Sequence, residues 1–132
     1  MKKLLIVLLM VVLTASALLG CAGEKAVDAK VYGKEDTNIS VRVGEEFTLK
    51  LDENPTTGYQ WSYTVSDENV VVLSKDEYVP DSTDEDVVGA GGQRVLTFEA
   101  RSKGSTVIDM VYERSWEQNE NDEKLSFEIE VK

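Results

Sequence analysis

Apolar and polar residues alternate with a period of two along most of the chain after residue 36. The cleanest run is Leu125, Phe127, Ile129 and Val131. This alternation is typical of β-strands that bury one face, and no window of similar length has the 3.6-residue period of an amphipathic helix. We therefore expect seven strands, at residues 37–43, 46–52, 60–66, 70–79, 93–101, 105–114 and 124–132.

Seven short strands separated by turn residues predict an all-β fold, an immunoglobulin-like antiparallel β-sandwich. A small barrel is the structural alternative. If successive strands run antiparallel, every second connection lies at the same end of the sandwich. The segments 54–58, 89–92 and 114–116 then lie together at one end. This inference requires a single strand between Ser66 and Gly89, and the alternative is two strands, at Val70–Leu73 and Glu77–Val79.

The N-terminal segment has the pattern of an export signal. Lys2 and Lys3 precede an almost unbroken apolar run, Leu4–Leu19, which is about as long as a secretory signal core and shorter than a membrane-spanning helix. The run ends in Leu18-Leu19-Gly20-Cys21, which resembles a bacterial lipobox, a motif cut before a Cys that becomes lipidated. The alternatives are an ordinary signal peptide with an incidental Cys, or an uncleaved anchor.

These features divide the chain into three parts: a lipoprotein signal peptide at 1–20, a lipidated Cys21 with a flexible tether at 21–36, and a folded domain at 37–132. Two or more acyl chains hold a protein stably on a membrane. We therefore expect the protein in the cell envelope, lipid-anchored to a membrane and facing outside the cytoplasm.

Composition excludes several classes of function. The chain has no His and one Cys, so it has no Ser-His-Asp or Cys-His nucleophile and no intrachain disulfide. A net charge of −11 argues against nucleic-acid binding, which requires Lys and Arg to displace counterions. We expect a monomeric binding domain with no enzymatic activity, no cofactor and no metal site.

Three segments are least explained by the strand pattern, and together they resemble the three motifs of the chagasin family. They are Asn54-Pro55-Thr56-Thr57-Gly58-Tyr59, Gly89-Ala90-Gly91-Gly92 and Arg114-Ser115-Trp116. The family patterns are N-P-T-T-G-Y/F, G-x-G-G and R-P-W/F, in the same order. Ser115 departs from the third pattern, which has Pro, and we expect this loop to be looser for that reason.

The resemblance implies an immunoglobulin-like inhibitor of papain-type cysteine proteases. In related inhibitors the first motif enters the active-site cleft, and the other two flank it. Carried over to this chain, the resemblance implies a protease-binding set made up of Asn54, Pro55, Thr56, Thr57, Gly58, Gly89, Gly91, Gly92, Arg114 and Trp116.

Each motif also has a purely structural interpretation. The first is then an ordinary turn, the glycines a flexible loop tip, and Trp116 a side chain folded over the end of the sandwich. The alternative function is a lipid-anchored surface sandwich that binds a glycan, a peptide or an envelope partner. We expect Trp61 to pack in the core with Tyr63 and Val65, and Tyr59 to support the first loop.

Overall fold

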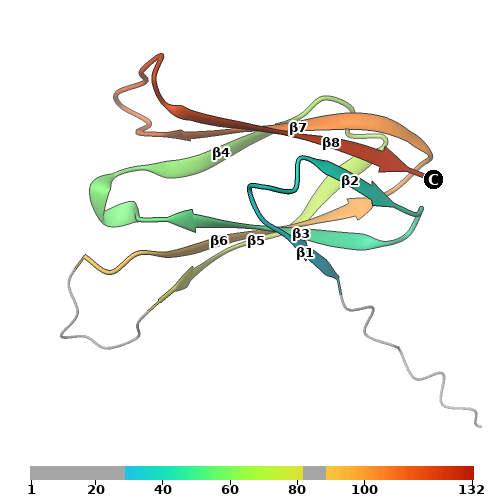
Figure 1. Cartoon of the computed structure of the whole chain (residues 1–132), viewed down its shortest axis with the longest axis horizontal. Helices are drawn as coiled ribbons and strands as arrows, with labels where there is room; N and C mark the ends of the chain where they lie inside the picture. Colours follow the sequence, from blue (N-terminus) through green and yellow to red (C-terminus); the bar gives the residue numbers. More distant parts are fainter. Residues whose placement is uncertain (1–28, 82–88) are drawn as a thin grey trace, which may run out of the picture.

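The computed structural model describes residues 29–81 and 89–132, which form two β-sheets packed face to face (Figure 1). The signal peptide, Cys21 and the first half of the expected tether lie outside the described residues. The strands are β1 Lys30–Tyr32, β2 Asn38–Val41, β3 Glu46–Glu53, β4 Gln60–Val65, β5 Val71–Pro80, β6 Gly92–Ala100, β7 Gly104–Glu113 and β8 Glu123–Val131, with a 3₁₀ turn, η2, at Pro55–Thr57.

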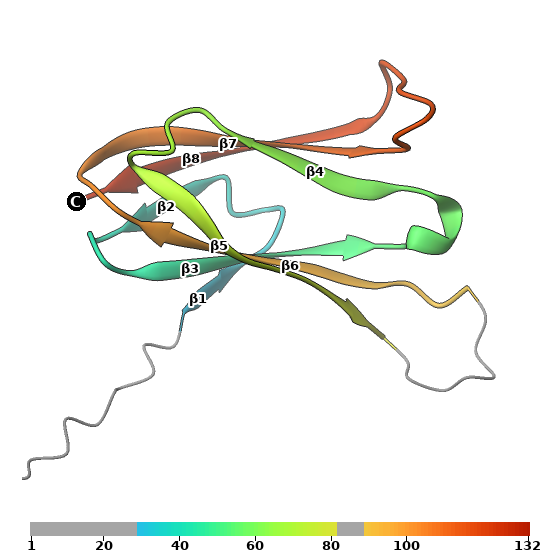
Figure 2. The ribbon, with the colours of Figure 1, turned by 180° about the vertical axis from the view of Figure 1, so that it is seen from behind.

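The expected all-β sandwich is confirmed, with two differences in its strands. The first sheet has the order β1-β3-β6-β5 and the second β2-β8-β7-β4. The edge pairs β1–β3 and β2–β8 are parallel, so the sandwich is not purely antiparallel. The N-terminal segment causes this, because it joins the first sheet as β1 and then crosses to the second sheet as β2 (Figures 1 and 2).

The additional strand, β1, lies inside the segment expected to be a tether. Its three residues pair with β3, where Lys30 is opposite Phe47 and Tyr32 opposite Leu49. The ring of Tyr32 also packs edge-on against Phe47, with centroids 6.4 Å apart. A three-residue strand is too short to show a period of two, so only its tertiary contacts reveal it.

The core contains the inward-facing residues of both sheets. Phe47 and Phe98 stack in its centre with ring centroids 5.5 Å apart. Trp61 is 5% exposed, as expected, whereas Tyr63 is 37% exposed and makes an edge-on contact with Phe98. The other fully or nearly buried apolar residues are Ile39, Val41, Leu49, Leu51, Val70, Val71, Leu96, Ala100, Ile108, Met110, Phe127, Ile129 and Val131.

The arrangement of the connections depends on β5, which is one strand with a bulge between Leu73 and Lys75. Because β5 is a single strand, successive connections lie at opposite ends of the sandwich, as expected. The β3–β4 turn, the β7–β8 loop and the strand ends that flank the β5–β6 connection therefore lie at one end of the sandwich (Figures 1 and 2). In the described residues no helix is long and apolar enough to span a membrane.

Candidate functional site

The β3–β4 connection, Asn54–Gly58, is a 3₁₀ turn capped by its own first residue. The Asn54 side-chain Oδ1 accepts hydrogen bonds from the Thr56 backbone N–H at 3.2 Å and from Thr56 Oγ1 at 2.5 Å. Pro55 fixes φ at the first position of the turn, and Gly58 leaves it with φ +84°, a value that favours glycine. The turn is therefore braced before any partner binds.

Both threonine hydroxyls of this turn donate their protons to Asn54. Thr57 Oγ1 donates to the Asn54 carbonyl at 2.7 Å and accepts from the Tyr59 N–H at 3.4 Å. The side chains of Thr56 and Thr57 are nevertheless exposed at the tip. Because a hydroxyl has one proton and two lone pairs, these groups are oriented to accept hydrogen bonds from a partner.

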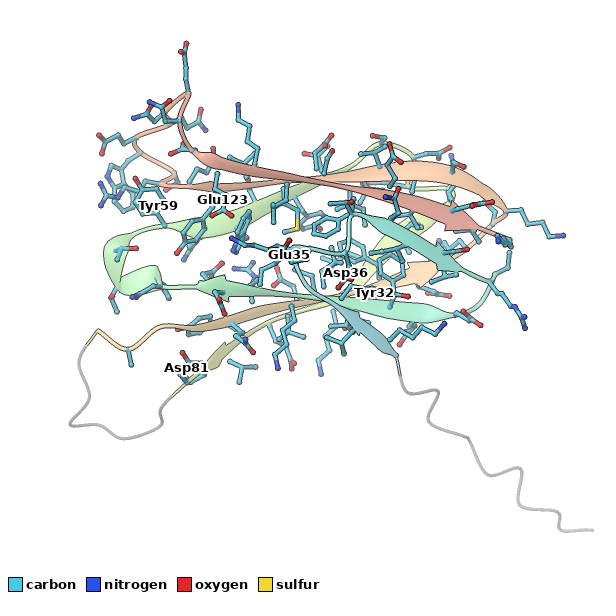
Figure 3. All side chains as sticks on the ribbon, in the orientation of Figure 1. Tyr32, Glu35, Asp36, Tyr59, Asp81 and Glu123 are labelled. Atoms are coloured by element: carbon cyan, nitrogen blue, oxygen red, sulfur yellow. The ribbon has the colours of Figure 1, made fainter. Side chains whose placement is uncertain are left out.

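Tyr112 of β7 contacts the turn and the aromatic residues that follow it. Its hydroxyl accepts a hydrogen bond from the Asn54 N–H at 2.9 Å. Its ring stacks on Trp61 at 4.9 Å between centroids and packs against Tyr59 at 5.3 Å. Tyr59 therefore belongs to an aromatic cluster that packs against the turn at the loop end of the sandwich (Figure 3), in agreement with its expected supporting position.

Arg114, at the end of β7, is directed toward the first loop. Its Nε donates to the Thr57 carbonyl at 3.0 Å, and its guanidinium carbon lies 4.6 Å from the centroid of the Tyr59 ring. Its Nη1 lies 3.4 Å from Glu117 Oε2. Three contacts orient this half-buried side chain, so Arg114 braces the Asn54–Gly58 loop.

Trp116 is the most exposed large apolar side chain in the described residues, at 71%. It lies at the tip of a tight turn closed by the hydrogen bond from the Glu117 N–H to the Arg114 carbonyl, 3.2 Å long. One edge of its indole covers Gly58. The side chain is thus not folded into the sandwich, and the rest of the ring faces solvent.

The glycine motif divides into residues with different surroundings. Gly89 is exposed, has φ +81° and accepts a hydrogen bond at 3.4 Å from Asn54 Nδ2. At Gly91 a Cβ atom would lie 3.5 Å from the Glu53 carbonyl oxygen, an ordinary contact. Gly92 is buried, and a Cβ there would lie 2.4 Å from the Val79 carbonyl oxygen. Close strand pairing therefore explains Gly92, whereas Gly89 and Gly91 border the first loop.

The motifs do not include three residues that hold this end together: Tyr112, Glu53 and Arg94. Glu53 is 3% exposed, and its carboxylate accepts from the Trp61 N–H at 2.8 Å and from Arg94 Nη1 at 3.3 Å. The pKa of Arg94 is raised above its ordinary value, first by its hydrogen bond to Asp76, so it stays cationic. One sequence signal was available, because Glu53 occupies an apolar phase of β3.

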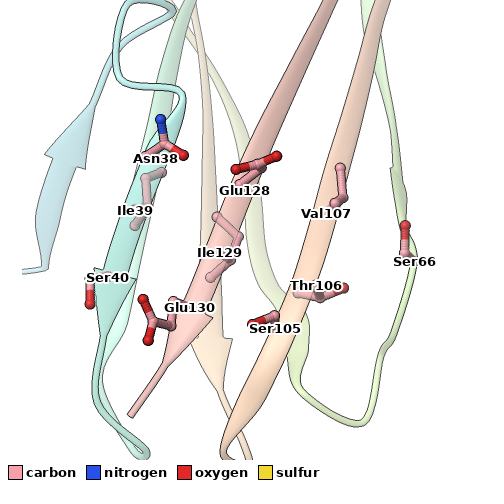
Figure 4. A pocket seen from close by; sticks show the side chains of 10 residues that line it. All are labelled: Asn38, Ile39, Ser40, Ser66, Ser105, Thr106, Val107, Glu128, Ile129 and Glu130. Carbon is pink, nitrogen blue, oxygen red and sulfur yellow. The ribbon is translucent and has the colours of Figure 1, made fainter.

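The largest-volume hollow described on the surface lies away from the predicted site residues. A hollow of about 480 Å³ lies at the far end of strands β2, β7 and β8 and includes none of the predicted site residues (Figure 4). Its lining includes Ser40, Ser105, Glu128 and Glu130. No group of three or more Cys, Asp or Glu residues suited to a metal ion occurs in the part of the chain that the structure describes.

Residues 40–131 match the family model described as chagasin family peptidase inhibitor I42. Amoebiasin-1 of Entamoeba histolytica is 32% identical over 96 residues, covering 73% of this chain and 91% of the relative. Chagasin of Trypanosoma cruzi is 28% identical over 83 residues, covering 59% and 73%. Among solved structures, the cysteine protease inhibitor EhICP2 of Entamoeba histolytica has a TM-score of 0.69 at 20% identity, covering 79% of this chain and 96% of its own.

Proposed function

This chain belongs to the chagasin family of peptidase inhibitors, and we propose that it is a reversible, tight-binding inhibitor of papain-like cysteine endopeptidases. The observation that carries the proposal is the convergence of three loops at one end of the sandwich, with the self-braced Asn54–Gly58 loop joined to both neighbours through Arg114 and Gly89. Membership in a family of inhibitors also makes this chain an inhibitor and not an enzyme.

The proposed mechanism is steric. The Asn54–Gly58 loop enters the active-site cleft and presents the exposed Thr56 and Thr57, while Gly89–Gly91 and Arg114–Trp116 rest on the two walls of the cleft. A braced loop loses little conformational entropy when it docks, which favours tight binding. The exposed indole of Trp116 is the type of side chain that dominates the binding energy of interfaces.

The geometry of the loop also explains how it resists cleavage. Three of its five carbonyl groups accept internal hydrogen bonds: that of Asn54 from Thr57, that of Pro55 from the Gly58 N–H at 3.0 Å, and that of Thr57 from Arg114. A nucleophile attacks only a carbonyl held in line with it. A 3₁₀ turn held by these hydrogen bonds does not adopt the extended conformation of a substrate, so we expect the complex to form and dissociate without hydrolysis.

The alternative, a surface sandwich that binds a glycan, a peptide or an envelope partner, has no comparable support. The family match covers most of the described chain and refers to peptidase inhibitors. The large hollow at the opposite end contains none of the three motifs.

The lipid anchor is the second part of the proposal. The motif Leu18-Leu19-Gly20-Cys21 supports cleavage after residue 20 and attachment through Cys21, with the protein in the cell envelope and facing outside the cytoplasm. The chain enters the sandwich at Lys30, which pairs opposite Phe47 near the start of β3, away from the Asn54–Gly58 loop. An anchor before β1 therefore leaves the three loops accessible. Incorporation of labelled palmitate, lost in Cys21→Ser, tests this.

The inhibitory activity is tested by titrating papain and several cathepsin-type enzymes with the full chain in detergent. We expect inhibition that is reversed by dilution and an inhibitor that is recovered intact. Absence of inhibition at micromolar concentrations across the panel contradicts the proposal.

A further inference from the structure

A chain of charged groups runs from a buried carboxylate next to the Asn54–Gly58 loop out to the surface, and none of its members belongs to the three motifs. Glu53, the last residue of β3, is almost fully buried. Its Oε1 accepts from Arg94 Nη1 of β6 at 3.3 Å, and Arg94 in turn makes two hydrogen bonds to Asp76 of β5, one of them 2.6 Å long from Nη2 to Oδ2. The group therefore ties together three neighbouring strands of the first sheet.

The same carboxylate reaches across to the second sheet. Glu53 Oε2 accepts from the backbone N–H of Trp61 in β4 at 2.8 Å. The Trp61 indole N–H also donates to the Asp52 carbonyl at 2.8 Å. Residues 52–53 enter the loop and residue 61 follows it, so these two hydrogen bonds fasten its two stems together. The position of the tip relative to the sheets depends on both.

The chemical nature of Glu53 argues for a role in placing the loop. Glu53 follows Phe47, Leu49 and Leu51 on the inward face of β3. Burying a carboxylate at such a position costs free energy because its bound water is removed, whereas burying an apolar side chain has no such cost. The carboxylate instead fixes the positions of the groups that donate to it, because charge-assisted hydrogen bonds are short and geometrically specific. Its two oxygens serve the two sheets separately, which a leucine or an amide cannot do.

We propose that Glu53, held by Arg94 and Asp76, is a positioning residue that sets the docking geometry of the Asn54–Gly58 loop. The inference rests on the proposed inhibitory function and adds residues outside the three motifs to its machinery. Glu53 itself is buried and does not touch the protease. It affects inhibition by holding the residues on either side of the loop in place.

The decisive variant is Glu53→Gln, which keeps the shape of the side chain. The amide has a single acceptor oxygen, so its NH₂ group must face either the Trp61 N–H or Arg94, both of which are donors. Because a charge-assisted hydrogen bond is lost, we expect the inhibition constant against papain to rise by about tenfold, mainly through faster dissociation. Amide hydrogen exchange of the free protein should accelerate at Trp61 and in residues 56–59.

Two control variants separate positioning from general stability and from charge. Ile129→Val removes a methyl group from the core on β8, far from Glu53 and Arg94, and lowers stability without a change in the inhibition constant. Glu46→Gln removes the same charge from the exposed start of β3 and should alter neither property. If Glu53→Gln binds papain like Ile129→Val, Glu53 is merely structural and the proposal is wrong.

A second variant keeps the test valid if Glu53→Gln does not fold. Arg94→Lys retains the charge but lacks the planar fork that serves Glu53 and Asp76 together. We expect weaker inhibition and faster exchange at Trp61. Unchanged exchange at Trp61 and residues 56–59 overturns the proposal even if no tested protease is inhibited. Failure of the wild-type chain to inhibit, with the exchange changes present, contradicts the inhibitory function alone.

Discussion

The indole of Trp116 lies so close to Gly58 that a Cβ atom at residue 58 would stand 2.3 Å from Trp116 Cη2 and 2.7 Å from Cζ2. The two residues belong to different loops, and their contact leaves no space for a side chain. The first and third motifs therefore meet at this point. The position of the Trp116 ring depends on glycine at residue 58 both for space and for backbone conformation.

Gly58→Ala is expected to weaken inhibition by moving the Trp116 ring. The positive φ strains an alanine by roughly 1–2 kcal/mol, and the new methyl group displaces the exposed indole. The matched control is Gly44→Ala, because Gly44 has φ +87° and open space around its Cβ position. Urea denaturation should show similar losses of stability in both variants, whereas the inhibition constant against papain should rise only for Gly58→Ala. If both variants inhibit papain equally, the position of Trp116 does not depend on glycine at residue 58.

Trp116→Ala separates binding from folding. The side chain is mostly exposed, so its removal costs little folding stability. As an interface anchor it contributes about 2 kcal/mol of binding free energy, equivalent to a roughly 30-fold rise in the inhibition constant. The inhibition constant of Trp116→Phe should lie between those of the wild type and Trp116→Ala. The measurement is titration of papain alongside thermal unfolding, and an unchanged inhibition constant would return Trp116 to a packing role.

Gly92→Ala is expected to destabilise the first sheet. A Cβ atom at residue 92 would lie 2.4 Å from the Val79 carbonyl oxygen and 2.6 Å from the Tyr78 hydroxyl, so the backbone of β5 has to shift to admit it. Separation of β5 from β6 at this point costs about 1–3 kcal/mol, as overpacking does. Gly33→Ala, with open space at its Cβ position, is the control. Thermal unfolding checks the difference. Equal melting temperatures would show that Gly92 is not needed for packing.

The period of two located the main strands because each buries one face. Expected strands at 46–52 and 124–132 correspond to Glu46–Glu53 and Glu123–Val131. The strand count also placed the three motifs at one end, since direction reverses with each strand. β1 was missed because three residues have no measurable period, and its parallel pairing depends on the edge that β3 offers.

The internal bracing of the site was beyond a sequence pattern. Asn54 and Tyr112 are 58 positions apart, and their hydrogen bond depends on the register of β4 against β7. The contact between Arg114 and Thr57 depends on the same register. Glu53 was visible in the sequence as an acid in an apolar phase, but its partners Arg94 and Trp61 follow from the packing of the two sheets.

The Thr56 hydroxyl donates to Asn54 Oδ1, so its contribution to inhibition should depend on Asn54. Thr56→Val removes the donor with little change in shape, and Asn54→Ala removes the acceptor. If the hydroxyl acts by bracing the loop, each single change weakens binding to papain, and Thr56→Val costs nothing further in the Asn54→Ala background. A double-mutant cycle should then give a coupling energy of about 1 kcal/mol.

Thr56→Ser is the control for this cycle, because it keeps the hydroxyl and should preserve most of the inhibition. Additive effects in the cycle would mean that the hydroxyl contacts the protease independently of Asn54. The hydroxyl would then act through its lone pairs, which accept from a protease donor while its proton stays on Asn54. In that case the bracing of the loop does not account for the contribution of Thr56 to inhibition.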